Sequence, residues 1–138
     1  TVNIVLSAKA RDMAQAGLIA DISVSLPENL PIADPDLCAL FGNAVDNAIE
    51  AAKDAADKRI TIRARADKGL LMLRVTNAYA GKREEKTDGL FATTKADKRA
   101  HGFGLSGMRE IAVRNGGTLE TTAKDGVFEL VACLPLAK

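Results

Sequence analysis

The longest periodic segment of this chain is centred on the stretch Phe41-Gly42-Asn43-Ala44-Val45-Asp46-Asn47-Ala48-Ile49-Glu50-Ala51. Apolar side chains recur there at the spacing of one helix face, which predicts an amphipathic helix from Asp34 to about Ala56. The apolar face consists of Leu37, Leu40, Phe41, Ala44, Val45, Ala48, Ile49 and Ala52. Asp34 suits the N-cap, and Pro35 suits the first helical position because the N–H that it lacks would have no partner there.

A polar stripe runs along the same helix, roughly opposite its apolar face. It consists of Asn43, Asn47, Glu50 and Asp54, at spacings i, i+4, i+7 and i+11. An amphipathic helix usually exposes its polar face to solvent, and that is one interpretation. The other is a binding site, because asparagine is a weak helix former and its amide oxygen is a hard ligand of the kind that Mg²⁺ prefers. The spacing alone leaves both interpretations open.

The segments on either side predict a sheet with one face in solvent. A helix opens the chain, and strands are expected at Ile19–Leu26, Arg59–Ala66, Leu71–Val75, Thr118–Ala123 and Val127–Leu134. Apolar and polar residues alternate along these strands, so each strand has one apolar side. Asp67-Lys68-Gly69 and Asp125-Gly126 suit tight turns with positive φ. The expected fold class is therefore α/β, with helices covering one face of the sheet only.

The hydrophobic period disappears between Ala78 and Gly102. A polar loop of this length inside a compact domain is usually functional or disordered. Beyond it, the spacing of four apolar residues predicts a short helix that ends at Asn115-Gly116-Gly117, where glycine supplies a left-handed stop. The four residues are Leu105, Met108, Ile111 and Ala112.

A glycine-rich run, His101-Gly102-Phe103-Gly104-Leu105-Ser106-Gly107, joins this loop to the helix. It contains GxGxxG, but the dinucleotide-binding motif needs a strand directly before it, and here a polar loop comes first. Glycines that run into a helix N-terminus offer free N–H donors to a phosphate, and Thr93, Thr94 and Lys95 could add hydroxyls and a charge. The plainer interpretation is that the glycines are loop hinges. No GxxxxGK[ST] loop or HRD motif is present, which excludes the P-loop and serine/threonine kinase folds.

Composition excludes several classes of partner. The chain has 19 Lys+Arg and 18 Asp+Glu, a formal charge of +1, so it lacks the basic excess that holds proteins to nucleic acid or anionic lipid. No apolar run is long enough to span a bilayer, and the N-terminus has no signal-peptide pattern. Cys38 and Cys133 lack CxxC spacing, so we expect buried, reduced thiols rather than a disulfide or a metal site.

Two of these motifs together resemble a known superfamily. The stretch 41–51 resembles the N box of the GHKL superfamily, which includes gyrase, heat-shock chaperone ATPases, histidine kinases and mismatch-repair ATPases. His101-Gly102-Phe103-Gly104-Leu105 resembles the second glycine box of that superfamily. The local pattern is most similar to the histidine kinases that include peptide-sensing quorum receptors. The resemblance implies a Bergerat fold, a two-layer α/β sandwich with a mixed sheet, that binds ATP and Mg²⁺.

The resemblance also implies a site, position by position. Asn47 would ligate Mg²⁺ and Asn43 would lie near the phosphates, both as catalytic positions. Gly102 and Gly104 would present backbone N–H groups to the phosphates. Residues 78–102 would form the ATP lid. The other nucleotide-contacting positions would be Glu50, Asn77, Gly81, Thr94, Lys95, His101 and Leu105.

Two positions depart from the superfamily pattern. The adenine-binding DxGxG box is replaced by Asn77-Ala78-Tyr79-Ala80-Gly81, which on its own suits a turn. An asparagine amide can still accept a hydrogen bond from the adenine amino group and donate one to a ring nitrogen. Asn43 stands where the hydrolytic members carry a glutamate that activates water, and an amide cannot take a proton. This departure favours phosphoryl transfer to a separate acceptor over hydrolysis.

The function implied by the resemblance is that of the catalytic domain of a sensor histidine kinase. Residues 17–138 would form this domain, and residues 1–16 the tail of an upstream dimerisation helix. The phosphoacceptor histidine would lie outside the chain, because His101 belongs to the glycine box. The partners would be the dimerisation helices of a homodimeric parent and a response regulator. The domain would be cytoplasmic and its parent anchored in the plasma membrane. The alternatives are a degenerate GHKL domain that acts as a non-catalytic interaction module, and a GHKL ATPase.

Overall fold

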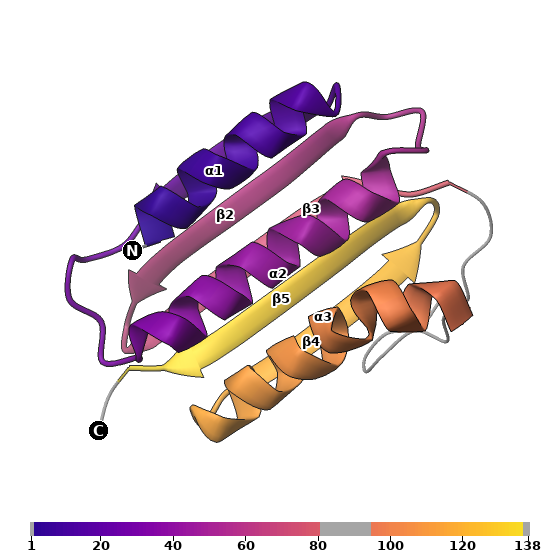
Figure 1. Cartoon of the computed structure of the whole chain (residues 1–138). Coiled ribbons are helices and arrows are strands. Elements are labelled where there is room, and N and C mark those ends of the chain that lie inside the picture. Colours follow the sequence, from indigo (N-terminus) through magenta and orange to yellow (C-terminus); the bar gives the residue numbers. More distant parts are fainter. Residues whose placement is uncertain (1, 81–94, 137–138) are drawn as a thin grey trace.

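The computed structural model describes the backbone of residues 2–80 and 95–136, and the side chains of residues 2–80 and 104–136. Within these residues, three helices lie side by side on one face of a five-stranded sheet (Figure 1). The elements are α1 (Val2–Gln15), β1 (Ile19–Ser25), α2 (Asp34–Ala52), β2 (Arg59–Asp67), β3 (Leu70–Ala78), α3 (Lys95–Arg114), β4 (Thr118–Lys124) and β5 (Val127–Pro135). The predicted two-layer α/β sandwich is confirmed.

The sheet is mixed, with the strand order β1-β2-β3-β5-β4. β1 pairs with β2 in parallel, and the other neighbouring strands are antiparallel. A parallel pair needs a crossover connection, and α2 supplies it between β1 and β2. The hairpins β2–β3 and β4–β5 are joined by the pairing of β3 with β5.

Side chains alternate along the strands between the helical layer and solvent. On β5, Phe128, Leu130, Ala132 and Leu134 are buried, whereas the residues between them are half-buried. β2, β3 and β4 show the same alternation. The prediction of a sheet with one face in solvent is therefore confirmed, because the buried side chains all point toward the helices.

α2 lies at the centre of the helical layer, between α1 and α3 (Figure 1). Its Leu40 and Phe41 are fully buried. α1 packs beside α2 and places Val2, Leu6 and Met13 in the same core. In this structure α1 is thus a packed part of the sandwich, and its origin in an upstream dimerisation helix stays a prediction.

Both hairpins turn where the sequence predicted. Lys68 and Gly69 have φ of 53° and 78°, and Asp125 and Gly126 have φ of 55° and 79°. These are the left-handed values that a two-residue type I′ turn requires.

The C-terminal end of α3 is also as predicted. Gly116, with φ of 80°, donates from its N–H to the Val113 carbonyl at 2.9 Å, and Gly117 donates to the Ala112 carbonyl at 2.7 Å. This pair of bonds is a Schellman motif. Gly117 also passes so close to β5 that a Cβ there would collide with the Cys133 carbonyl oxygen.

α2 begins and ends at different residues from those expected. The carbonyl of Ala33 accepts the first helical hydrogen bond, from the Leu37 N–H at 3.0 Å. Ala33 is therefore the N-cap, and the prediction of Asp34 is wrong because Asp34 is already helical. The helix ends at Ala52, earlier than the apolar pattern suggested, because Ala55 is buried in the connection that follows instead of in another helical turn.

α3 begins at Lys95, ten residues before Leu105, where the helix was expected to begin. The residues between them carry no apolar period, so the hydrophobic pattern could not reveal that they are helical. The second part of the expected loop is thus the first half of α3, and residues 81–94 lie outside the described residues.

The two cysteines lie in α2 and β5, the elements predicted for them. Cys38 and Cys133 are free thiols, half-buried instead of buried as expected. In the part of the chain that the structure describes, no helix has the length and apolar character to cross a membrane.

Candidate functional site

The polar stripe of α2 faces α3. Asp36 precedes Asn43 by two helical turns and therefore lies on the same stripe. The Asp36 carboxylate accepts hydrogen bonds from Arg114 at 2.6 Å and from the Asn115 side chain at 3.0 Å, at the C-terminal end of α3. The sequence placed the stripe roughly opposite the apolar face. Asn43 and Asn47 are half-buried and therefore flank that face, whereas Glu50 and Asp54 are exposed.

The next row of α2 side chains faces α1. Lys9 of α1 forms an ion pair of 2.8 Å with Asp46. The backbone of Gly42 leaves room for the Val5 and Lys9 side chains, which would touch a Cβ at that position at 3.7 and 3.8 Å. Contacts on both flanks therefore hold α2 in one rotation about its axis, and this rotation keeps Asn43 and Asn47 turned toward α3.

Asp36 ties the N-terminal end of α2 to the C-terminal end of α3. Hydrogen bonds from Arg114 and Asn115 lower the pKa of the Asp36 carboxyl, so it stays charged under mildly acidic conditions. Because the two helices are antiparallel, the other end of their contact lies at the C-terminal half of α2. That half carries Asn47 and Glu50.

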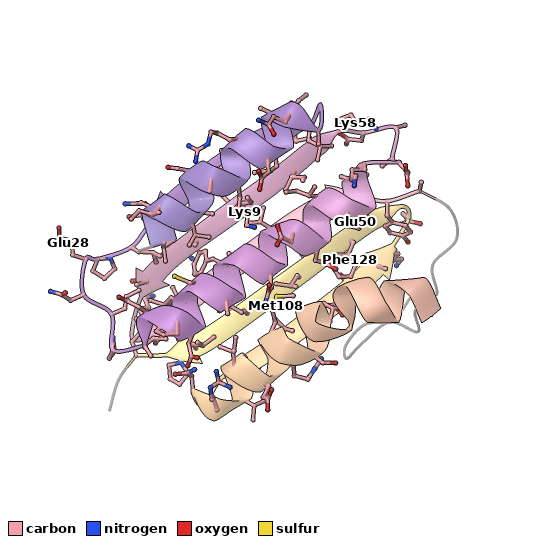
Figure 2. All side chains as sticks on the ribbon, in the orientation of Figure 1. Lys9, Glu28, Glu50, Lys58, Met108 and Phe128 are labelled. Atoms are coloured by element: carbon pink, nitrogen blue, oxygen red, sulfur yellow. The ribbon has the colours of Figure 1, made fainter. Side chains whose placement is uncertain are left out.

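Asn77 lies at this same end of the sandwich, near the end of β3. It is 2 % exposed and is paired with Phe128 of β5. Figure 2 places Phe128 on β5 and Glu50 on α2 toward this end of the molecule. The Asn77 Nδ2 donates to the Ala78 carbonyl at 2.8 Å, and no hydrogen-bond partner is found for its Oδ1 in the described part of the chain.

A buried amide oxygen without a partner is unusual, because most buried polar atoms in folded proteins are hydrogen-bonded. The bond to Ala78 sets the orientation of the Asn77 amide, so Oδ1 is presented as an acceptor. Two bonds to adenine were expected for this amide, one accepted and one donated. Nδ2 already donates to Ala78, so the bond accepted by Oδ1 is the one that the described contacts leave open.

The second glycine box does not lie at the start of α3. Gly102 and Gly104 are within the helix, which begins at Lys95. The expectation that they precede a helix N-terminus is wrong for this structure, because the helix extends back through the polar residues before them. Leu105 is 7 % exposed and packs in the hydrophobic core.

Other predicted positions lie outside what the structure describes. Gly81 and Thr94 belong to residues 81–94, and the side chains of Lys95 and His101 are among those not described. The positions that the described side chains bring together are therefore Asn43, Asn47 and Glu50 on α2. Asn77 lies near the end of β3, buried on the sheet face that the helices cover. Their roles toward a nucleotide stay predictions.

The predicted metal position is a single amide. Within residues 2–80 and 104–136, no group of three or more His, Cys, Asp and Glu side chains is arranged to hold a metal ion. Mg²⁺ in phosphoryl-transfer sites usually takes one or two protein ligands, with phosphates and water as the others. Asn47 fits such a site, since its amide oxygen is a hard ligand on a helix that the core holds in place.

The sequence did not predict the contacts of α2 with α3. Asp36, Arg114 and Asn115 were not among the expected functional residues, and their hydrogen bonds join α2 to the C-terminal end of α3. A signal was present, because Asp36 continues the spacing of Asn43 and Asn47 toward the N-terminus of the helix.

Comparison with solved structures shows the fold of histidine kinase catalytic domains. The nucleotide-free catalytic domain of histidine kinase ThkA is 20% identical, with a TM-score of 0.71, and the match covers 98% of this chain and 90% of that domain. Histidine kinase AdeS of Acinetobacter baumannii is 18% identical with a TM-score of 0.67, over 99% of this chain. The chain spans 64% of the AdeS chain.

Sequence comparison gives the family. A search of curated protein sequences found no match. The family model of the GHKL domain matches residues 33–135, which include α2, all of β2 to β5, and α3. This match covers well over half of the chain, and the resemblance first noted in the N box and the second glycine box is thereby confirmed. The chain belongs to the GHKL domain family, and its fold is that of histidine kinase catalytic domains.

Proposed function

We propose that this chain is the ATP- and Mg²⁺-binding catalytic domain of a histidine kinase, and that it transfers the γ-phosphoryl group of ATP to a histidine outside these residues. The observation that carries the proposal is the buried Oδ1 of Asn77, which has no partner in the described part of the chain. The adenine amino group supplies the N–H donor that this acceptor lacks. GHKL domains as a family bind ATP, and this chain has that family's fold.

The residues of α2 would act on the phosphate end of the nucleotide. Asn47 would hold Mg²⁺, which neutralises phosphate charge when it is bound. Asn43, one turn earlier on the same stripe, would donate a hydrogen bond through its amide. An amide cannot accept a proton from water, so the α2 stripe suits transfer of the phosphoryl group to a positioned acceptor better than hydrolysis.

The parent protein would supply what this chain lacks. A kinase of this kind needs a phosphoacceptor histidine on dimerisation helices and a response regulator that takes up the phosphoryl group. We propose that both lie outside residues 1–138, in a homodimeric parent whose catalytic domain faces the cytoplasm from a plasma-membrane anchor.

A second candidate is a GHKL domain that no longer binds nucleotide and acts as an interaction module. Tyr79 supports it, because a half-buried tyrosine that packs against the core stands where the DxGxG box has its first glycine. The unpartnered Oδ1 of Asn77 speaks against this candidate, because a domain without nucleotide would supply no donor to it.

Calorimetric titration with ATP and ADP in the presence and absence of Mg²⁺ separates the two candidates. We expect Mg²⁺-dependent binding that is lost or strongly weakened in Asn47→Ala and unchanged in Asn3→Ala, a matched asparagine that is exposed on α1. If the wild-type chain binds neither nucleotide, the interaction module is the better description. Mixing the chain with the separate phosphoacceptor helices and ATP then tests for acid-labile phosphohistidine on those helices.

A further inference from the structure

The face of the sheet that points away from the helices is open. All three described helices pack on the other face, so the outward side chains of the five strands meet no other element in residues 2–80 and 95–136 (Figure 1). A hollow of about 400 Å³ lies in this open face, over β1, β2 and β3. We name it the arginine hollow. Its polar lining residues are Ser23, Ser25, Arg63, Arg65 and Arg74.

The strand register brings these polar side chains together. Ser25 lies beside Arg65 in the parallel pair of β1 and β2. Arg65 is opposite Met72 in the antiparallel pair of β2 and β3, so Arg74, two residues further along β3, is its diagonal neighbour. Diagonal neighbours lie about 7–8 Å apart, which is within reach of long side chains. Three adjacent strands therefore supply hydrogen-bond donors to the same hollow.

Arg65 and Arg74 keep donors that the fold does not use. Arg63 is committed, because it donates to two backbone carbonyls at 3.0 and 3.1 Å and to the Asp21 carboxylate at 3.2 Å. Arg74 meets Glu129 only through its Nε, at 3.4 Å, so both of its Nη groups are left over. For the Arg65 guanidinium, no hydrogen bond or ion pair is found with any residue that the structure describes.

The arginine hollow is positively charged, and none of the residues that line it is acidic. Arg63 is directly opposite Arg74, and like charges in such cross-strand pairs are unfavourable. Asp21 and Glu129, at the border of the hollow, each compensate one of these two arginines. Three arginines against two carboxylates leave a net charge of +1, which belongs to Arg65. The hollow therefore suits an anion.

The directions of the donors distinguish between kinds of anion. A carboxylate has two oxygens in one plane, and a single arginine can satisfy both of them. A phosphate group has three strongly accepting oxygens that point in different directions. The donors of the arginine hollow come from three sides, with the Ser25 hydroxyl on β1, Arg65 on β2 and the Nη groups of Arg74 on β3. This arrangement fits a tetrahedral phosphate better than a planar carboxylate.

We propose that the arginine hollow binds the phosphate group of a phosphate monoester. Arg65 and Arg74 hold the phosphate oxygens, and Ser25 donates to the oxygen on the β1 side. The organic part of the ligand lies over Met72, the half-buried apolar residue of the lining. Both arginines are exposed, and water competes for exposed charges, so we expect a dissociation constant of about 1 mM.

An NMR titration of the chain with methyl phosphate at constant ionic strength tests the proposal. We expect saturable shifts of the backbone amides around the hollow on β1, β2 and β3, and weaker binding of acetate. Arg65→Gln should weaken methyl phosphate binding about tenfold, because it removes a charged hydrogen-bond donor. Arg65→Lys should give an intermediate affinity, because lysine keeps the charge but lacks the planar fork of donors.

Arg59→Gln is the matched control. Arg59 is an exposed arginine on the same strand as Arg65, about 20 Å along it, and does not line the hollow. The change removes the same charge from the same strand, so it should leave methyl phosphate binding unchanged if the contact is local.

A phosphate monoester can be free in solution or can belong to a lipid headgroup. Cosedimentation with phosphatidylcholine vesicles, with and without phosphatidic acid, distinguishes the two sources. Retention on vesicles that contain phosphatidic acid, abolished in Arg65→Gln, would assign the ligand to a lipid. Binding of methyl phosphate without such retention would assign it to a soluble phosphate monoester.

Three results would overturn the proposal. The first is a titration without saturable shifts, or with shifts confined to α2 and α3, where the proposed ATP site lies. The second is an unchanged affinity for methyl phosphate in Arg65→Gln, with circular dichroism showing that the variant is folded. The third is acetate binding as tight as that of methyl phosphate. The hollow and the ATP site lie on opposite faces of the sheet, so Arg65→Gln should leave ADP binding unchanged, and either proposal can fail without the other.

Discussion

Replacing Asn77 with alanine removes the buried acceptor on which the proposed adenine site depends. Asn77 is 2 % exposed. In the variant, bulk water therefore could not take the place of the lost acceptor, and the N–H group of the ligand would stay without a partner. A buried donor left without its partner costs about 1–3 kcal/mol. At about 1.4 kcal/mol for each factor of ten, we expect the dissociation constant for ADP to rise about 5- to 150-fold in Asn77→Ala.

The ligand can be changed in the same way as the protein. Inosine diphosphate carries a carbonyl oxygen where ADP carries the amino group, so it would bring an acceptor against the acceptor Oδ1 of Asn77. The wild-type chain should therefore prefer ADP by calorimetry. In Asn77→Ala the preference should shrink toward equal binding, because the alanine methyl group cannot distinguish an amino group from a carbonyl. This comparison forms a double-mutant cycle between one side chain and one ligand group.

Asn77→Ala also removes the hydrogen bond from Nδ2 to the Ala78 carbonyl. Urea unfolding of the variant measures the effect of losing this hydrogen bond on stability. The comparison of ADP with inosine diphosphate is made under conditions where the variant is folded, so the lost stability does not affect it. Equal affinity of the wild-type chain for the two diphosphates would refute the reasoning. So would a preference for ADP that persists in full without the Asn77 side chain.

Three further outcomes follow from the described contacts. Hydrogen bonds lower the pKa of the Asp36 carboxyl in the folded chain. This group therefore stabilises the fold above its unfolded pKa of about 3.9, and the stabilisation is lost as the pH falls. Urea unfolding between about pH 5 and pH 3 should show a smaller loss of stability in Asp36→Asn than in the wild type. Burial and the charge of Glu120 raise the pKa of the Cys133 thiol, so Glu120→Gln should speed its alkylation at about pH 8, followed by mass spectrometry. Gly117→Ala should lower the free energy of unfolding by about 3 kcal/mol or prevent folding, because its Cβ would collide with backbone. Gly107 lies on a helix and a Cβ there would have no atom within 4 Å, so Gly107→Ala should raise the free energy of unfolding by about 1 kcal/mol in the same assay.

The sequence predicted the elements whose chemistry is local. The apolar period of α2 and the alternation of the strands each bury one side, and Gly69 and Gly126 allow the positive φ of the two hairpin turns. These features need only a few neighbouring residues to be recognised. The sequence also identified the two family motifs, because each is contiguous along the chain. The first lies on α2, and the second lies within α3 instead of before it.

The sequence could not predict what each polar side chain faces. The spacing of Asn43 and Asn47 gives the angle between faces of a helix, but not which neighbouring helix each face meets. That depends on Asp36 and its partners on α3, which are nearly eighty residues away along the chain. The start of α3 was missed for a different reason, because charged residues can extend a helix without any apolar period.

The two halves of the candidate site differ in what holds them in place. Asn47 and Asn77 lie on α2 and β3, and both elements contribute buried apolar residues to the core. α3 contains Gly102, Gly104 and Gly107 within its twenty residues, and each interior glycine costs about 1 kcal/mol relative to alanine. The groups that would bind the base and the metal are therefore held by the core. The stretch that would meet the phosphates is the part of the site where leaving the helical state costs least, so a ligand can reshape it with little binding energy.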